Sequence, residues 1–265
     1  MFRITKYEFP NKDDLIIAHF SDIHYSINFK LNKLLEIEKR LKELKPDYIC
    51  ITGDIVDNIA VTTKSCIKHL LSFLEKLTKI APTIICLGNH DIRDYRGQKD
   101  NQWYERINSN IIVLNNSYYE DEKVYIYGIN LENNYYHNEK SNTYMLKNKI
   151  SEIRIKDDKY NILLFHSPIS FNQEEIKEIN KFDLVLTGHT HNGLTPDFLP
   201  GNFGIIAPGR GLFLKNARHS FKSGAANVII SGGITKLSKG TGLSFFDNLY
   251  AKDLVYIYLK NSKKT

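Results

Sequence analysis

The sequence predicts an α/β fold, because apolar strand-like runs alternate with amphipathic helical segments along its first part. Three apolar runs, at 15–20, 48–51 and 83–87, are separated by two segments whose apolar residues recur at helical spacing. This strand–helix–strand–helix–strand order indicates a parallel sheet with helical crossovers. Functional sites in such sheets form beyond the carboxyl ends of the strands.

The two helical segments each have an apolar face and a proline after it. Pro46 stops the first, which carries Leu31, Leu34, Leu35, Ile37, Leu41 and Leu44. Pro82 follows the second, which carries Ile67, Leu70, Leu71, Leu74 and Leu77. We also expect a short helix at 102–107 and a surface helix with loops within 131–158. Further strands are expected at 111–114, 124–127, 161–165, 182–186, 228–230 and 254–258.

The composition is that of an ordinary globular protein. The chain has 265 residues, of which 42% are hydrophobic and 25% charged, and no linker rich in proline, glycine or serine divides it. We therefore expect a single domain over 1–265. The formal net charge of +6 comes mostly from lysines scattered among acidic residues, which indicates a solvated surface and no clear nucleic-acid module. A mild positive field would still attract an anionic substrate.

The cysteines and the first residues indicate the cellular compartment in which we expect the protein. Cys50, Cys66 and Cys86 lie in apolar contexts and fit no zinc or redox spacing, so we interpret them as small buried hydrophobes in a reducing compartment. Residues 1–14 hold no apolar core of signal-peptide length, and no apolar stretch is long enough to span a bilayer. We expect a soluble, cytoplasmic protein with no membrane segment; its oligomeric state stays open.

Potential metal ligands follow five of the strand-like runs. They are Asp22 and His24, Asp54, Asn89 and His90, His166, and His189 and His191. Alternate residues of an extended segment point to one side, so Asp-x-His and His-x-His can each direct two side chains at one place. A set of imidazoles and carboxylates suits Zn, Fe or Mn. The sequence therefore predicts a metal centre.

These motifs together resemble those of a known family. Asp22-Ile23-His24, Gly53-Asp54-Ile55-Val56-Asp57, Gly88-Asn89-His90-Asp91, His166 and Gly188-His189-Thr190-His191 resemble, in order, the motif set of the calcineurin-like metallophosphoesterases, and most of all its compact bacterial single-domain members. The resemblance implies a sandwich of two mixed β-sheets flanked by α-helices. It also implies two metal ions bridged by Asp54: one held by Asp22, His24, Asp54 and His191, the other by Asp54, Asn89, His166 and His189.

The resemblance further implies roles beside the ligands. His90 would stabilise the transition state or protonate the leaving oxygen, and Asp91 could accept the other imidazole N–H of His90. Asp57 is either a support for a ligand histidine or a helix cap. Two ions about 3.5–4 Å apart would clamp an in-line displacement by a metal-bound hydroxide. With no nucleophilic Ser or Cys among the motifs, we expect no covalent phosphoenzyme.

Several of these residues have simpler interpretations when taken alone. Asp22 and Asp54 would then be turn or cap residues, and His166 a core histidine; the complete set favours ligands. His19 lies inside a strand and is expected to pack there. Surface or loop positions are expected for His69, His137 and His219.

The segment 192–216 is not explained by the motifs. Arg210 is a weak candidate for holding a substrate phosphate, against the simpler interpretation of a turn. The apolar residues around it predict packing, with a pocket for an apolar leaving group or acyl chain as the alternative; they are Phe198, Leu199, Phe203, Ile205, Ile206, Leu212 and Phe213.

We therefore predict a dinuclear metal-dependent hydrolase acting on an anionic phosphoester, with phosphodiesters as the first choice. The rivals are a pyrophosphohydrolase of a nucleotide-linked lipid intermediate, a nuclease, and a non-catalytic metal-binding scaffold. Monoester, diester and pyrophosphate bonds all remain open. Mn, Fe and Zn all accept such a ligand set, and we favour manganese.

Overall fold

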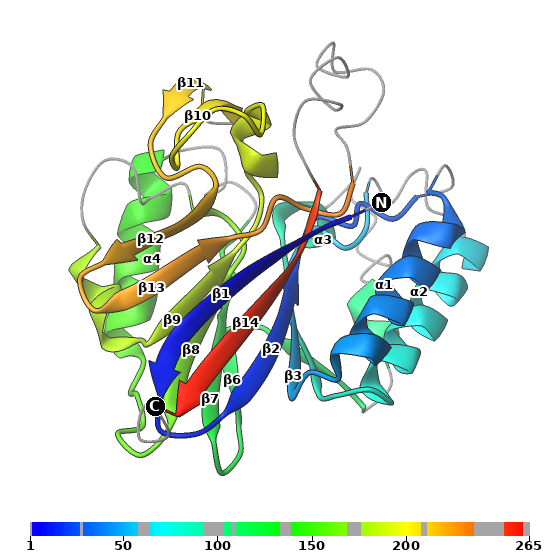
Figure 1. Cartoon of the computed structure of the whole chain (residues 1–265), viewed down its shortest axis with the longest axis horizontal. Coiled ribbons are helices and arrows are strands. Elements are labelled where there is room, and N and C mark those ends of the chain that lie inside the picture. The colour runs from blue at the N-terminus through cyan, green and yellow to red at the C-terminus, as the bar shows by residue number, and fades with distance from the viewer. Residues whose placement is uncertain are drawn as a thin grey trace.

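Two six-stranded mixed sheets form the body of the protein (Figure 1). The computed structural model describes residues 2–26, 29–57, 64–92, 103–107, 110–132, 139–168, 176–207, 211–235 and 252–261. The first sheet runs, in spatial order, β1 (Arg3–Asn11), β14 (Asp253–Asn261), β2 (Leu15–Phe20), β3 (Tyr48–Thr52), β4 (Thr83–Cys86) and β5 (Ile111–Leu114). The second runs β12 (His219–Ser223), β13 (Ala226–Ile230), β9 (Leu184–Thr187), β8 (Tyr160–Phe165), β7 (Val124–Ile129) and β6 (Ser117–Glu120).

Each sheet has a parallel centre. Strands β2, β3, β4 and β5 are parallel neighbours, as are β7, β8, β9 and β13. The antiparallel pairs β14–β2, β12–β13 and β6–β7 make both sheets mixed. The predicted sandwich of two mixed sheets is thus confirmed, and the central strands of each sheet end together at one edge.

Helices cover the outer faces of the two sheets. α1 (Leu31–Leu44) and α2 (Lys64–Thr78) pack on the first sheet, and α4 (Glu139–Glu152) packs on the second (Figure 1). α1 ends as predicted: Lys45 adopts a left-handed conformation, and Pro46 follows. The short elements are α3 (Asn89–Ile92) and the 3₁₀ helices η3 (Trp103–Arg106), η6 (Lys177–Lys181) and η7 (His191–Leu194).

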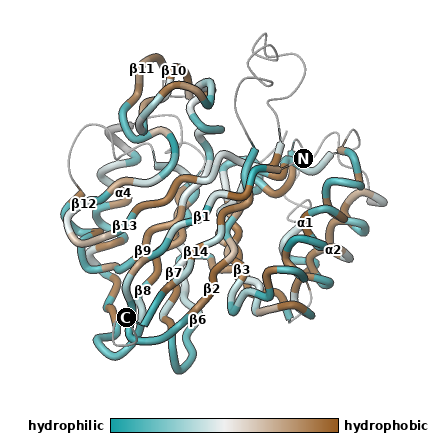
Figure 2. Tube along the Cα trace, in the orientation of Figure 1, coloured by the Kyte–Doolittle hydropathy of each residue, from teal (hydrophilic) through white to brown (hydrophobic). Residues whose placement is uncertain are grey.

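The uninterrupted apolar runs follow from burial on both faces of each strand. Along β2, Ile17 points into the layer between the two sheets, whereas Ala18 points toward the helices of the first sheet. Along β8, Ile162 lies in the same middle layer and Leu163 faces the α4 side. Figure 2 shows this apolar character as brown along the central strands. The middle layer joins the two sheets, so its side chains hold the motif-bearing strands in place.

Five strands were missed by the sequence reasoning. β1 and β12 are outermost strands with partly exposed residues, and β6 is an outermost strand of four residues, so none gives a continuous apolar run. β10 (Gly204–Ala207) and β11 (Gly211–Leu214) form a separate two-stranded sheet within the segment that was expected only to loop. The expected helix at 102–107 is the single 3₁₀ turn η3.

Replacing Ile162 with Ala should lower the free energy of unfolding by about 2–5 kcal/mol, because the middle layer would be left with a cavity. Urea denaturation followed by circular dichroism measures the change. Leu35→Ala on α1 is the control; its side chain is 59% exposed, so its change should stay within about 0.5 kcal/mol. Equal losses in the two variants would contradict the two-sided burial of β8.

Candidate metal centre

The predicted ligands lie just beyond the carboxyl ends of five neighbouring strands. Asp22 follows β2, Asp54 follows β3, Asn89 follows β4, His166 follows β8 and His189 follows β9. Backbone hydrogen bonds join these ends across the site. The N–H of Asp22 donates to the carbonyl of Gly53 (3.0 Å), and that of Gly188 donates to the carbonyl of His166 (2.8 Å). The ligand-bearing turns are therefore fixed to one another before any ion binds.

Many of the predicted ligands have left-handed backbone conformations. Positive φ angles, from 46° to 69°, occur at Asp22, His24, Asp54, His189 and His191. L-residues rarely adopt this region, and such strain concentrates at functional sites. Here the conformation turns the chain sharply at the end of a strand, which keeps each side chain over the sheet edge.

Gly188 precedes His189 because a larger residue would not fit. A Cβ atom at this position would lie 2.5 Å from Oγ of Ser21 and 2.7 Å from Oδ2 of Asp22. Glycine thus lets the β9 turn approach the carboxylate of Asp22 closely enough for the N–H of His189 to donate to its Oδ2 (2.9 Å).

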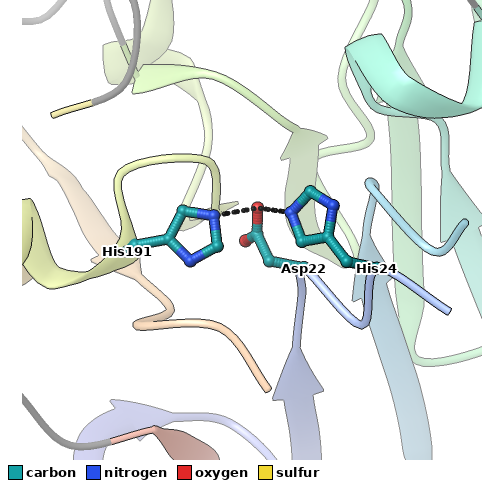
Figure 3. A group of neighbouring side chains, drawn as sticks. All are labelled: Asp22, His24 and His191. Carbon is teal, nitrogen blue, oxygen red and sulfur yellow. Dashed lines mark ion pairs between the residues drawn. The ribbon is translucent and has the colours of Figure 1, made fainter. Parts of the chain in front are cut away.

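The first group of ligands surrounds one oxygen of Asp22 (Figure 3). Oδ1 lies 3.7 Å from Nε2 of His24 and 3.6 Å from Nε2 of His191. The other oxygen, Oδ2, accepts hydrogen bonds from the hydroxyl of Ser21 and the N–H of His189. One oxygen is thus held by the protein, and the other faces two imidazoles.

The second group is formed by Asp54, His166 and His189. Oδ2 of Asp54 lies 3.1 Å from Nε2 of His166, which lies 3.2 Å from Nδ1 of His189. The other ring nitrogen of His166, Nδ1, lies 2.7 Å from the carbonyl of Thr52, to which it can donate. That hydrogen bond fixes the tautomer and leaves Nε2 for an ion, the usual arrangement of a metal-binding histidine.

Asp54 lies between the two groups. Its Oδ2 is 3.8 Å from Nε2 of His24 as well as 3.1 Å from Nε2 of His166, while its Oδ1 accepts the N–H of His90 (2.8 Å). The two groups each bring ligand atoms within 4.8 Å of one another. The arrangement could therefore hold one cation in each group, with Asp54 reaching both.

Buried polar atoms test whether a cation fits. Within the described residues, Oδ1 of Asp22, Nε2 of His24 and Oδ1 of Asn89 are buried and have no hydrogen-bond partner. Buried polar atoms in native proteins are almost always satisfied. These atoms are ligand types that divalent cations accept, and they belong to the predicted sets, so the residues present fit a metal centre.

The charges of the site are strongly coupled. Burial alone would raise the pKa of Asp54, but the imidazoles of His166, His90 and His24 hold it well below its usual value. Burial would likewise lower the pKa values of His24 and His166, yet the carboxylates of Asp22 and Asp54 raise both to about 9. Without an ion, the site balances its carboxylates with protons on these two histidines.

His90 and Asp57 lie at the more accessible side of the centre. Nδ1 of His90 is 3.6 Å from Oδ1 of Asp57, which is also 4.0 Å from Nδ1 of His24. The side chains of His90 and Asp57 are 27% and 25% exposed, whereas that of Asp54 is 3% exposed. His90 is therefore positioned to meet a substrate above the buried ligands.

Asp91 makes different contacts from those expected. Its carboxylate accepts hydrogen bonds from the backbone N–H groups of Gly88 (2.9 Å), Ile55 (3.0 Å) and Val56 (3.1 Å). Burial and the nearby charge of Asp54 raise its pKa to about 7. The carboxylate that faces the His90 imidazole is that of Asp57, and Asp91 ties the turn after β4 to the turn after β3.

The sequence reasoning missed one segment of the site, residues 231–235 after β13. Here Ile234 donates its N–H to the carbonyl of Ser21 (3.0 Å), and Thr235 donates to that of Asp22 (3.0 Å). This segment fixes the first turn from the opposite side. Its signal was the Gly232-Gly233 pair directly after an apolar strand, the same pattern that marks the other motifs.

The remaining histidines that the structure describes lie as expected in two cases out of three. His19 is buried in β2, with Nε2 2.8 Å from Oγ1 of Thr52. His69 is exposed on α2 as predicted, whereas His219, for which a surface or loop position was predicted, is half-buried in strand β12. Arg210 and His137 lie outside the described residues. None of the three cysteines forms a disulfide; Cys50 and Cys86 are buried as predicted, whereas Cys66 is partly exposed.

Comparison with known protein families assigns the chain to one of them. The sequence profile of the calcineurin-like phosphoesterases matches residues 15–193, which contain every predicted ligand. The chain belongs to this family.

The sequence similarity to individual relatives extends over different shares of the chain. An uncharacterized metallophosphoesterase of Campylobacter jejuni is 27% identical over 262 residues, which are 97% of this chain and 62% of that protein. The uncharacterized metallophosphoesterase YkuE of Bacillus subtilis is 27% identical and covers 84% of this chain and 72% of its own length. The UDP-2,3-diacylglucosamine pyrophosphatase LpxG of Chlamydia trachomatis is 32% identical over 90 residues, or 33% of this chain. The chain thus spans under two thirds of the Campylobacter protein.

Replacing Asp54 with Asn should lower the metal content of manganese-loaded protein by at least one ion per chain, because a neutral amide cannot offset the repulsion of two cations. Asp57→Asn is the matched control from the same motif and should keep its full metal content. Elemental analysis after desalting gives both numbers. Full occupancy in Asp54→Asn would contradict the shared position of this carboxylate.

Metal uptake should release about two protons at pH 7. The pKa values of His24 and His166 are raised to about 9, so both imidazoles are protonated at pH 7 and must lose the proton to bind an ion. Affinity should accordingly fall as the pH is lowered from 9 to 6. Calorimetry with Mn²⁺ in two buffers of different ionisation enthalpy counts the protons.

His90→Gln serves as the control for this proton count. Burial lowers the pKa of His90, so its imidazole is neutral at pH 7 and its loss should not change the count. Uptake without proton release at pH 7 would contradict the assigned charges.

Proposed function

We propose that the chain is a dinuclear metal-dependent phosphodiesterase with manganese as its favoured ion. The carrying observation is the position of the Asp54 carboxylate, with Oδ2 3.1 Å from Nε2 of His166 and 3.8 Å from Nε2 of His24. In the proposed assignment one ion is held by Asp22, His24, Asp54 and His191, and the other by Asp54, Asn89, His166 and His189. Residues 1–265 are taken as one domain, since the two sheets share one apolar layer.

The ions and the side chains have separate tasks in this proposal. Two bound divalent cations would neutralise phosphate charge and lower the pKa of a water nucleophile to about 7. Asp22 and Asp54 hold their oxygens toward the ions because backbone N–H groups fix the opposite oxygens. Asp91 holds the turns that carry Asp54 and Asn89 in register through its three backbone hydrogen bonds.

His90 is the proposed proton donor to the leaving oxygen. A hydrogen on Nδ1 directed at Asp57 leaves Nε2 to carry the mobile proton, and the 3.6 Å separation can shorten when substrate binds. Burial lowers the pKa of His90, and the charges of Asp54 and Asp57 oppose that shift. A bound phosphate anion adds negative charge, which raises the pKa and favours the protonated imidazole.

Phosphodiesters are preferred because the motif set resembles that of compact bacterial phosphoesterases. The same site chemistry would cleave a pyrophosphate bond, and two observations favour this as the second candidate. One is the partial similarity to LpxG. The other is the group of exposed apolar side chains Phe198, Phe203, Leu212 and Phe213, which would bring the site to a surface that carries a lipid-linked substrate. Faster turnover of UDP-2,3-diacylglucosamine than of any simple diester would favour the second candidate.

Metal-stripped protein should regain turnover of bis-p-nitrophenyl phosphate on adding Mn²⁺, with Fe(II) and Zn²⁺ compared separately. His90→Ala should lower kcat by about 10²–10⁴-fold. The loss should be larger for diphenyl phosphate, because phenolate is a poorer leaving group and needs the proton more. An equal loss for both esters would indicate a merely structural role for His90.

The control for this experiment is His69→Ala, which removes an exposed histidine of α2 and should leave turnover unchanged. Turnover that survives complete removal of metal would overturn the proposed function as a whole.

A further inference from the structure

An exposed apolar surface lies next to the segment that carries His191 and contains none of the groups that would act on the scissile bond. It is formed by Phe198, Phe203, Leu212 and Phe213, which we call the hairpin surface. Phe198 is 82% exposed, Phe213 68% and Leu212 60%. The other large apolar side chains exposed in the described residues are Leu31 and Leu35 on α1, Tyr118 on β6 and Tyr144 on α4. Exposed apolar side chains gathered in one place mark interaction sites.

Two residues of the hairpin surface, Leu212 and Phe213, lie on β11, while Phe203 directly precedes β10 and Phe198 lies in the loop before it. β10 and β11 belong to neither large sheet. Figure 1 shows this hairpin standing apart above β12, and Figure 2 shows its apolar character. The rings of Phe203 and Phe213 stack, with centroids 5.9 Å apart. Phe213 has a φ of 59°, a conformation that bulky residues rarely adopt. Backbone strain of this kind concentrates at functional segments.

A buried arginine holds the loop under Phe198 in shape. Arg218 is fully buried, and its guanidinium donates to the backbone carbonyls of Gly201 (2.9 Å), Pro196 (3.2 Å) and Leu199. These three hydrogen bonds fix the backbone on both sides of Phe198. The exposed ring is therefore displayed on an ordered frame.

The segment that carries the hairpin surface has basic residues and no acidic ones. No Asp or Glu occurs between Asp197 and Asp247, and Lys215 and Lys222 of this segment are exposed. Asp197, directly before Phe198, forms an ion pair with Arg3. Elsewhere lysines alternate with acidic residues, as in Glu36-Ile37-Glu38-Lys39. Exposed apolar side chains with lysines on the same segment match the surface of an anionic bilayer.

The hairpin is attached to the metal centre through η7. A Cβ atom at Gly193 would lie 2.4 Å from Cα of Gly204, so the segment that carries His191 directly contacts β10. The N–H of Ile205 also donates to Oγ1 of Thr195 (2.8 Å). A partner seated on the hairpin surface would thus lie beside the metal ligands.

We propose that the hairpin surface docks the protein on anionic phospholipid bilayers. A single acyl chain would need a concave apolar pocket, whereas these side chains are largely exposed. A second copy of the chain would bring two acid-free segments of like charge together, which opposes pairing. The bilayer supplies both the apolar layer and the negative charge.

The test is flotation of the full chain with vesicles, at low and at physiological ionic strength. Vesicles of phosphatidylglycerol and phosphatidylcholine should bind the protein, and pure phosphatidylcholine vesicles should bind it at least tenfold less. Leu212→Ser/Phe213→Ser should lower the partition coefficient at least tenfold, and Lys215→Gln about fivefold.

Matched controls distinguish the hairpin surface from exposed side chains in general. Leu35 and Tyr144 are 59% and 66% exposed, so Leu35→Ser/Tyr144→Ser removes similar apolar groups from α1 and α4 and should leave binding unchanged. Lys39→Gln on α1 controls for loss of one charge. Asp54→Asn should bind vesicles like the unaltered chain, so docking can be judged even if hydrolysis fails.

Several results would overturn the proposal. They are absence of binding to anionic vesicles, equal losses in the hairpin and control variants, and tighter binding to a single-stranded oligonucleotide than to vesicles. A dimer in light scattering that Leu212→Ser/Phe213→Ser abolishes would assign the hairpin surface to a second copy instead.

Discussion

In Asp22 and in Asp54, the protein backbone holds one carboxylate oxygen, and the other oxygen points to the proposed metal position. In both residues one oxygen accepts a backbone N–H, from His189 or His90, and the other faces two imidazoles. A carboxylate held in this way cannot rotate to satisfy both oxygens with scaffold donors. Its free oxygen therefore stays directed at the imidazoles, where it raises the pKa of a histidine or neutralises a cation.

The two carboxylates keep this orientation because the turns after the strands position the N–H donors, and the packing of the sheets positions those turns. The backbone donors to the two carboxylates come from different strand ends: the turn after β9 donates to Asp22, and the turn after β4 donates to Asp54. The parallel strands must therefore be in register and the two sheets correctly packed before either carboxylate is held. The middle apolar layer provides this, since it takes alternate side chains from both sheets. The packing of the core therefore also determines the geometry of the site.

Sequence reasoning could propose the ligands because each follows an apolar run, and burial on both faces of a strand makes such a run visible. The same reasoning could not assign Asp91, because its partners are backbone N–H groups at positions 55, 56 and 88, which any sequence supplies. For Asp57 the sequence left two roles open, a helix cap or a support for a ligand histidine. The structure places its Oδ1 3.6 Å from Nδ1 of His90. The outermost strands β1 and β12 escaped because one side of each is exposed, so their apolar residues do not form runs.

The family motifs say nothing about the structure or role of segment 192–216. Seven of the motif residues share one proposed task, metal binding, whereas the described strands of this segment, β10 and β11, carry no proposed ligand and belong to neither large sheet. Its anchoring to Gly193 and Thr195 nevertheless couples it to His191. A surface attached in this way can change its side chains without altering either sheet, because its strands pair only with each other. Under the two proposals made above, the sheet edge would cleave the bond, and the hairpin would determine which surface is brought to that edge.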